Sequence, residues 1–348
     1  MISLDEVGAR AGQFTLRDVT FTIPTGAWGI ILGPVGSGKT TLLEAIAGIR
    51  RVTRGRIALR GIDVTTDPPE QRRIGMVYQH AFLFPHLSVD ENIAYGALDV
   101  SAAHEIASRL GARTLASRPV SSLSGGERQV VALARALAAH TDILLLDEPF
   151  AALDPRLRTS IRAEMRRIHR ERGMTILQVT HDFIEAGTLG DVAVVLSDGS
   201  VAQVDPPDVL FRKPATASVA DFLGFENVFS GQIAVAVQPV EGARVLQFNG
   251  CGIGLVGVGE HPGGPGHAVI RAADVVLARD TPEASSARNV LAGVVVSVSN
   301  HGALSRVTLE VGTSTLAATV TEAAVQEMGF MAGVPAVAMI KATAVHLC

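Results

Sequence analysis

The sequence predicts an α/β domain built on a parallel sheet, followed by a smaller all-β domain. Three apolar runs, at residues 143–146, 175–179 and 192–196, are typical of strands that are buried on both faces. Charged residues number 50 among the first 227 positions but only 14 among the last 121, where helical periodicity nearly vanishes. We therefore expect the α/β domain over residues 1–225 and the all-β domain over residues 228–348.

The first stretch with a chemical signature is Gly33-Pro34-Val35-Gly36-Ser37-Gly38-Lys39-Thr40-Thr41. It follows the apolar run 29–32 and precedes a helical pattern with Leu42, Ile46 and Ile49, which is the context of a phosphate-binding loop. Glycines let the backbone wrap around phosphates, and the helix N-terminus points N–H groups at their charge. We expect Lys39 to reach the outer phosphates and Thr40 to ligate Mg²⁺.

Two adjacent carboxylates, Asp147 and Glu148, follow the apolar run 143–146. Ligands of α/β proteins bind at the carboxyl edge of the sheet, so both side chains are expected to face the phosphate loop. Asp147 would hold Mg²⁺ through water, and Glu148 would polarise the attacking water. The alternative is a pair of solvated acids at a strand end.

A second candidate helix start is Ser124-Gly125-Gly126-Glu127. The Ser-x-x-Glu spacing predicts a capping box, which alone explains Glu127. A cap does not require two glycines, whereas a second phosphate-binding helix N-terminus would use them to approach a nucleotide closely.

With these motifs in this order, residues 1–225 resemble the ATP-binding subunits of ABC transporters, which are P-loop NTPases with a helical subdomain. Phe14 resembles the aromatic residue that stacks on adenine, Gln79 the Q-loop glutamine, and residues 124–127 the signature motif. Asp154 resembles the D-loop aspartate and His181 the switch histidine near the γ-phosphate. Two positions depart from the family pattern. Val35 stands where the family usually has serine, and Gln178 is an unusual residue in the segment before the switch histidine.

The resemblance implies ATP and Mg²⁺ as cofactors and assigns roles to residues. The implied catalytic residues are Glu148, His181, Gln79 and Asp154, and the implied metal ligands are Thr40, Gln79 and Asp147. The implied nucleotide contacts are Phe14, Gly33, Val35, Gly36, Ser37, Gly38, Lys39, Thr40, Thr41, Ser124, Gly125 and Gly126.

The resemblance also implies partners. Two chains would pair head to tail, with the phosphate loop of one and residues 124–126 of the other enclosing ATP. The apolar segment 82–87, just after Gln79, resembles the surface that receives a membrane permease, and the alternative is a local core segment. An extracytoplasmic substrate-binding protein would act only indirectly, through the permease.

In the all-β part, strand alternation predicts four buried faces. They are Ile233, Val235 and Val237; Val294, Val296 and Val298; Val307, Leu309 and Val311; and Leu316, Ala318 and Val320. The segment 227–233 echoes 289–295, and 269–277 echoes 339–347, so we infer two copies of a small β-barrel unit.

This tail resembles the tandem oxyanion-binding domains of molybdate and tungstate importer ATPases. The likeness is carried by residues 286–289 and 340–345, and Lys341 is notable because the chain has only two other lysines, at 39 and 213. The candidate oxyanion ligands are Ser286, Arg288, Asn289, Lys341 and Thr343. An exposed strand-end lysine is the alternative.

Four functions remain open from sequence. The first is an ATPase driving molybdate or tungstate import; the second is the same ATPase with sulfate, polyamine, ferric iron or sugar as cargo. The third is a soluble ABC ATPase of translation or DNA repair, and the fourth makes the tail an oxyanion buffer or regulator. A net charge of −4 gives no indication of the basic surface that nucleic-acid binding requires. The acidic N-terminus and the isolated Cys251 and Cys348, to which we assign no role, favour the cytoplasm. The resemblance implies that the chain lies at the cytoplasmic face of the membrane, held there by the permease.

Overall fold

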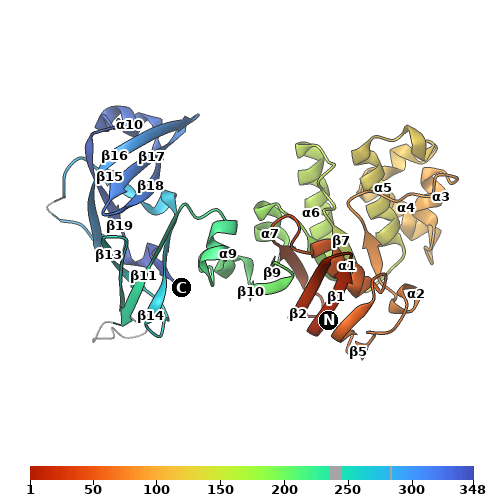
Figure 1. The fold of residues 1–348 in the computed structure, drawn as a ribbon. Helices are drawn as coiled ribbons and strands as arrows, with labels where there is room; N and C mark the ends of the chain where they lie inside the picture. The colour runs from red at the N-terminus through yellow and green to blue at the C-terminus, as the bar shows by residue number, and fades with distance from the viewer. Residues whose placement is uncertain (236–244, 283) are drawn as a thin grey trace. The chain divides into compact units, whose positions relative to one another are not determined.

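The computed structural model describes residues 1–235, 245–282 and 284–348 (Figure 1). They form two compact units, unit 1 (Met1–Leu210) and unit 2 (Phe211–Cys348). The functional division at residues 225–228 stays a prediction. Among the described residues, no helix combines the length and apolar character needed to cross a membrane.

A six-stranded sheet forms the centre of unit 1. Its strands, in spatial order, are β10 (Ser200–Asp205), β9 (Val192–Ser197), β3 (Trp28–Leu32), β8 (Thr175–Val179), β7 (Ile143–Asp147) and β6 (Gly75–Val77). All neighbours are parallel except β10, which runs antiparallel to β9. The parallel sheet predicted from the three apolar runs is therefore confirmed, and every residue of β7 and β8 is buried.

A second, antiparallel sheet shares its core with the first. Its strands, in spatial order, are β2 (Phe14–Ile23), β1 (Ile2–Ala11), β4 (Val52–Leu59) and β5 (Ile62–Asp63). The helix α1 (Lys39–Ala47) contacts both β1 and β7, with Leu42 and Ile46 buried. The prediction for Ile49 is wrong: α1 ends at Ala47 because Gly48 takes a left-handed conformation, and Ile49 is exposed.

The remaining helices of unit 1 include a group beyond β6. In Figure 1, α3 (Val89–Ala94), α4 (Val100–Arg109) and α5 (Gly125–Ala138) gather at this end, and α5 contacts α3, α4 and β6. These form the predicted helical subdomain. The others are α2 (Pro69–Arg72), η1 (Ala112–Leu115), η2 (Val120–Ser122), α6 (Pro155–Arg172), α7 (Phe183–Leu189) and α8 (Pro207–Leu210).

Unit 2 contains two five-stranded antiparallel sheets. The first has the order β13 (Ile253–Val258), β12 (Val245–Gly250), β11 (Asn227–Val235), β14 (Gly264–Ile270) and β20 (His346–Leu347). The second has the order β15 (Val276–Ala278), β19 (Pro335–Ile340), β16 (Asn289–His301), β17 (Leu304–Val311) and β18 (Ser314–Thr321). The short helices are α9 (Ala217–Phe222), η3 (Ala272–Asp274), α10 (Glu322–Met328) and η4 (Ala342–Ala344).

The two copies inferred from sequence exchange their last strands. β15 ends the first copy but pairs in the second sheet with β19, whereas β20 ends the second copy and pairs in the first sheet with β14. One hydrophobic core joins both sheets. The equivalent positions of η3 and η4, each just before the exchanged strand, confirm the internal repeat.

The predicted strand faces are mostly right. Val307, Leu309, Val311, Leu316, Ala318 and Ile233 are buried, and Val298 and Val320 are half-buried against the same core. Val237 lies outside the described residues. Val235, Val294 and Val296 are exposed, and Val295 is buried instead. An irregularity in the pairing of β16 with β17, between Val295 and Ser297, breaks the simple alternation.

Candidate functional site

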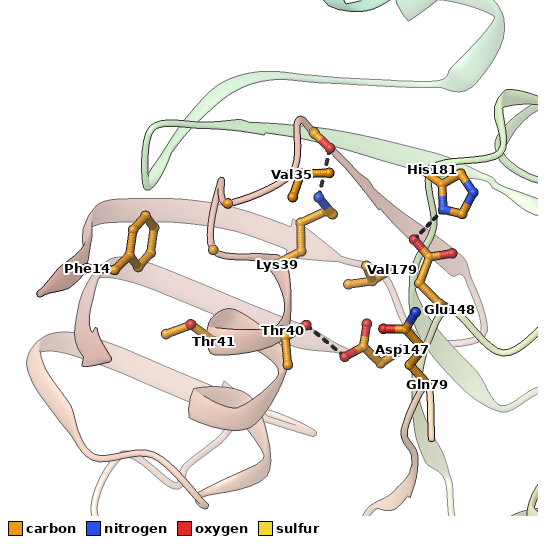
Figure 2. Close-up of a pocket in the computed structure, with 13 residues that line it drawn as sticks. Phe14, Val35, Lys39, Thr40, Thr41, Gln79, Asp147, Glu148, Val179 and His181 are labelled. Carbon is orange, nitrogen blue, oxygen red and sulfur yellow. Dashed lines mark hydrogen bonds and ion pairs between the residues drawn. The ribbon is translucent and has the colours of Figure 1, made fainter. Parts of the chain in front are cut away.

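A glycine-rich loop joins β3 to α1 and packs directly on the ring of Phe14. Gly38 has φ +99°, and a Cβ built there would lie 2.4 Å from the Phe14 ring. Any larger residue would displace the ring, so glycine is required for both conformation and space. In Figure 2 the Phe14 ring lies beside this loop at the edge of the cavity.

Lys39 is the first residue of α1, and its side chain reaches back to the loop. Its Nζ donates to the carbonyl oxygens of Gly33 and Pro34, each at 2.8 Å. Figure 2 shows the Lys39 side chain extending toward Val35. Burial lowers the pKa of Lys39, and the nearby carboxylates Glu148 and Asp147 oppose that shift. A partly buried ammonium group at the N-terminus of a helix suits a polyphosphate, whose charge would compensate it. Ser37 Oγ is also buried there with no partner among the described residues.

Thr40 and Asp147 bring two hard oxygen atoms together. Thr40 Oγ1 donates to Asp147 Oδ2 at 2.8 Å, and Gln79 lines the same cavity (Figure 2). Burial raises the pKa of Asp147, while the Thr40 hydrogen bond and the Lys39 charge oppose the rise. Hydroxyl, carboxylate and amide oxygens are ligands that Mg²⁺ accepts, so this donor set fits that ion.

Glu148 and His181 contact each other on one side of the cavity, away from Phe14 (Figure 2). Glu148 Oε1 lies 2.8 Å from His181 Nδ1 (Figure 2), and the Glu148 backbone N–H donates to the Val179 carbonyl. The Glu148 side chain is 13% exposed, and burial raises its pKa against the opposing effect of His181. Its φ of +46° is unusual for glutamate and resembles the backbone strain often stored at functional sites. A carboxylate held in this way is suited to accept a proton.

The cavity has a volume of about 710 Å³ and collects most of the predicted site. It is lined by the predicted residues Phe14, Gly33, Val35, Gly36, Gly38, Lys39, Thr40, Thr41, Gln79, Asp147, Glu148 and His181. Five predicted residues are not in this lining: Ser37, Ser124, Gly125, Gly126 and Asp154.

Ser124 and Asp154 cap helices of their own chain. Ser124 Oγ accepts the Glu127 N–H at the start of α5, and the Glu127 carboxylate accepts the Ser124 N–H, which confirms the predicted capping box. Asp154 Oδ1 accepts the N–H groups of Arg156 and Leu157 at the start of α6. The catalytic and signature roles predicted for these two residues need a partner from outside this cavity.

The segment 82–87 lies on the surface of unit 1. Phe82 is 64% exposed and none of the six side chains is buried, which argues against the core alternative. Arg135 of α5 donates to the Phe82 carbonyl at 2.6 Å, and its guanidinium lies 5.1 Å from the centroid of the Phe84 ring. Asn92, fully buried, bonds both the N–H and the carbonyl of Phe84.

Sequence reasoning missed the residues that fix this region to α5. Besides Arg135 and Asn92, Gln129 is 1% exposed and its Nε2 donates to the Tyr78 carbonyl, directly before Gln79. Gln129 follows two charged residues, so the local pattern gave no sign of burial.

In unit 2, the prediction that Asn289 binds an oxyanion is wrong. Asn289 is 3% exposed; its Oδ1 accepts the Val256 N–H, and its Nδ2 donates to the carbonyls of Val256 and Ile340. Its counterpart in the first copy, Asn227, makes the same pair of bonds to Ala317 of the second sheet. Both asparagines therefore join the two sheets, and both N–H donors of the Asn289 amide are already used.

The other oxyanion candidates divide into two groups. Lys341 and Thr343 line a cavity of about 550 Å³ within unit 2, together with Arg271, Arg212 and Lys213. Ser286 and Arg288 are exposed and outside this lining, although β16 and β19 pair as neighbours, with Asn289 opposite Ile340.

Comparisons with known proteins agree with this geometry. The ABC transporter family matches residues 16–151, and the TOBE domain family matches residues 285–347. The chain is 38% identical to the molybdate/tungstate import ATP-binding protein of Pyrococcus horikoshii, over 100% of this chain and 99% of that protein. The corresponding protein of Thermococcus kodakarensis is 45% identical over 80% of this chain and 83% of its own length.

Other matches are confined to part of the chain. The sulfate/thiosulfate import ATP-binding protein of Yersinia pseudotuberculosis is 46% identical over 63% of each chain. A solved dimeric ATP-binding cassette with bound ADP and phosphate is 30% identical, with a TM-score of 0.54, over 60% of this chain and 99% of that one. The nucleotide cavity, the fold and the full-length similarity lead to one conclusion: the chain belongs to the ABC transporter ATP-binding proteins and is an ATPase of that family.

Proposed function

We propose that this ATPase works as a homodimer with Mg²⁺ and energises import of molybdate or tungstate through a membrane permease. The observation that carries the proposal is one cavity that holds Lys39, the Thr40–Asp147 pair and the Glu148–His181 pair. These groups provide phosphate binding, metal ligation and proton acceptance, which are the components of ATP hydrolysis.

Each residue has a distinct part in the reaction. Lys39 and the loop N–H groups bind the phosphates, and Phe14 provides a face for the adenine ring. Glu148 accepts a proton from the attacking water, and His181 holds the Glu148 carboxylate in place. Thr40, Asp147 and Gln79 would hold Mg²⁺, which neutralises charge on the phosphate oxygens when bound.

Two chains are required in this proposal. Ser124–Gly126 would approach the phosphates held by the partner subunit, and Asp154 would lie at the same interface. Support comes from the dimeric cassettes of known structure, which are 30% identical to this chain. The segment 82–87 would receive the permease at the cytoplasmic face of the membrane, and a substrate-binding protein would act on the other side of it.

The cargo is inferred from the relatives. Molybdate/tungstate import proteins match the full length of the chain, including unit 2, whereas the Yersinia sulfate/thiosulfate protein matches 63% of it. Uptake of labelled molybdate, tungstate and sulfate by proteoliposomes that contain the chain and its permease tests this choice. ATP-dependent uptake of sulfate alone would reject it.

Coupling to the permease has a matched test. Phe82→Asp should abolish transport while the purified chain keeps its basal ATP hydrolysis, because Phe82 is 64% exposed and outside the nucleotide cavity. Ile62→Asp is the control, since Ile62 is 63% exposed on β5 of the same unit. Equal transport by the two variants would exclude the segment 82–87 as the docking surface.

Unit 2 is proposed to sense the oxyanion through Lys341 and Thr343, with Arg271 replacing Asn289 among the ligands. Calorimetry on the full chain should show binding of molybdate and tungstate that weakens in Lys341→Ala but not in Arg279→Ala, an exposed arginine of unit 2 outside the cavity. No heat with either oxyanion would remove the sensor and leave the ATPase assignment untouched.

A further inference from the structure

A buried hydrogen-bond network joins β3, β8 and α7 of unit 1 beside the nucleotide cavity. Gln178, in the middle of β8, is fully buried, and its Oε1 accepts from the Trp28 indole on β3 at 3.1 Å. Its Nε2 donates to Glu185 Oε2 on α7 at 2.7 Å. The unusual glutamine before the switch histidine therefore joins the strand of the phosphate loop to α7.

Arg162 of α6 completes this hydrogen-bond network. Its Nη2 donates to Glu185 Oε1 and, at 2.5 Å, to Asp182 Oδ2. The Arg162 side chain is 14% exposed, and its guanidinium lies 5.8 Å from the centroid of the Phe150 ring. Phe150 follows Glu148 by two residues and Asp182 follows His181 by one, so Arg162 contacts both segments that carry the reacting pair.

The switch segment, residues 180–182, is fixed on either side of its histidine. The Thr180 N–H donates to the Ile31 carbonyl of β3, and Asp182 is held by Arg162 and by its cap on α7. His181 itself is 74% exposed, so little packing orients its ring. Its position relative to Glu148 therefore depends on the residues next to it.

The free-energy cost of burying the Glu185 carboxylate explains why every member of the network is needed. Glu185 is 4% exposed, and a buried carboxylate is tolerated only when its charge and both oxygens have partners. Arg162 serves one oxygen and the charge, and Gln178 serves the other oxygen. An apolar residue at position 178 would leave both the Trp28 N–H and one Glu185 oxygen without this partner.

We propose that Arg162 is a positioning residue for ATP hydrolysis, anchored by Glu185 and Gln178, which holds His181 against Glu148. The proposal rests on the proposed role of His181 in hydrolysis. Neither Arg162 nor Glu185 lines the nucleotide cavity, so their loss should lower kcat and leave the KM for ATP nearly unchanged.

The test neutralises the Arg162–Glu185 ion pair, so that the buried Glu185 carboxylate is not left charged without its partner. Arg162→Gln alone would strand the Glu185 carboxylate and could unfold the chain, so Arg162→Gln is combined with Glu185→Gln. ATP hydrolysis is then measured in four proteins: the parent, this double variant, His181→Ala, and the triple variant. Thermal unfolding of each protein verifies that it is folded at the assay temperature.

We expect the double variant to lose about tenfold in kcat with KM within about twofold, and the triple variant to match His181→Ala. Arg162→Lys, which keeps one cation beside the two carboxylates, should recover part of the loss. Arg167→Gln on the exposed side of α6 is the control and should hydrolyse at the parental rate.

Two results would overturn this inference and leave the proposed role of His181 intact. The first is a parental kcat in a folded double variant. The second is a triple variant tenfold slower than His181→Ala, because that would show a role of Arg162 independent of His181. Parental hydrolysis by His181→Ala would instead remove the proposed role of His181, and this inference with it. The two failures are thus distinguishable in one set of assays.

Discussion

Replacing Arg72 by methionine should destabilise unit 1 by about 3–5 kcal/mol. Arg72 is 2% exposed and donates to four carbonyls: Ala45 and Ile46 at the end of α1 at 2.9 and 2.8 Å, Asp67 at 2.9 Å and Thr65 at 3.2 Å. Hydrogen bonds from a charged donor contribute about 1.5–3 kcal/mol each, or about 6–12 kcal/mol together. Burying a guanidinium offsets several kcal/mol of this, and the difference is the expected loss.

The only tryptophan of the chain makes this loss measurable in unit 1 alone. Trp28 is fully buried in β3, so its fluorescence during urea denaturation follows the unfolding of unit 1. Arg73→Met is the matched control, because Arg73 is the neighbouring residue and is exposed. If the free energy of unfolding of Arg72→Met were within about 0.5 kcal/mol of that of the control, these bonds would not stabilise α1 and the phosphate loop that precedes it.

Three further predictions concern catalysis and pH. Lys39→Ala should abolish ATP binding, whereas Glu148→Gln should bind ATP as a stable dimer on size-exclusion chromatography and hydrolyse it at least about 100-fold more slowly; parental hydrolysis would contradict the assigned base. Mixing Lys39→Ala with Ser124→Arg chains should restore some activity, since mixed dimers have one intact site, unless both sites must fire together. Burial lowers the pKa of His169, so the unfolded state binds its proton at a higher pH than the folded state does. As the pH falls from about 6.5 toward the folded-state pKa, unit 1 should lose up to about 1.4 kcal/mol of unfolding free energy per pH unit; urea denaturation followed by Trp28 fluorescence should show this slope, and His169→Phe should lack it.

Much of the fold and the nucleotide cavity could be predicted from sequence because their signals are local. The phosphate loop, the paired acids at the end of β7 and the capping box at Ser124 are each set by residues within a few positions of one another. Such spacing reports directly on backbone conformation and on which groups meet at a strand end.

The errors arose where a side chain depends on a distant partner. Asn289 was predicted to be a ligand, but it bonds Val256, 33 residues away. Gln178 is unusual for its position in the family, and its partner Trp28 lies 150 residues away in sequence. Val294 was assigned to the wrong face because a bulge in the pairing of β16 with β17 does not show in the sequence of one strand.

The two glycines that open α5 differ in a way that bears on the dimer. A Cβ on Gly126 would lie 3.1 Å from the Ala152 carbonyl oxygen, so packing within unit 1 restricts that position. A Cβ on Gly125 would have no heavy atom within 4 Å, and its backbone is not left-handed. Glycine is a poorer helix former than alanine. Nothing in the described part of the chain therefore explains glycine at position 125, and we propose that a group from outside the chain approaches the backbone there. A phosphate held by the partner subunit's loop meets that description, and this is the arrangement that the mixed dimers test.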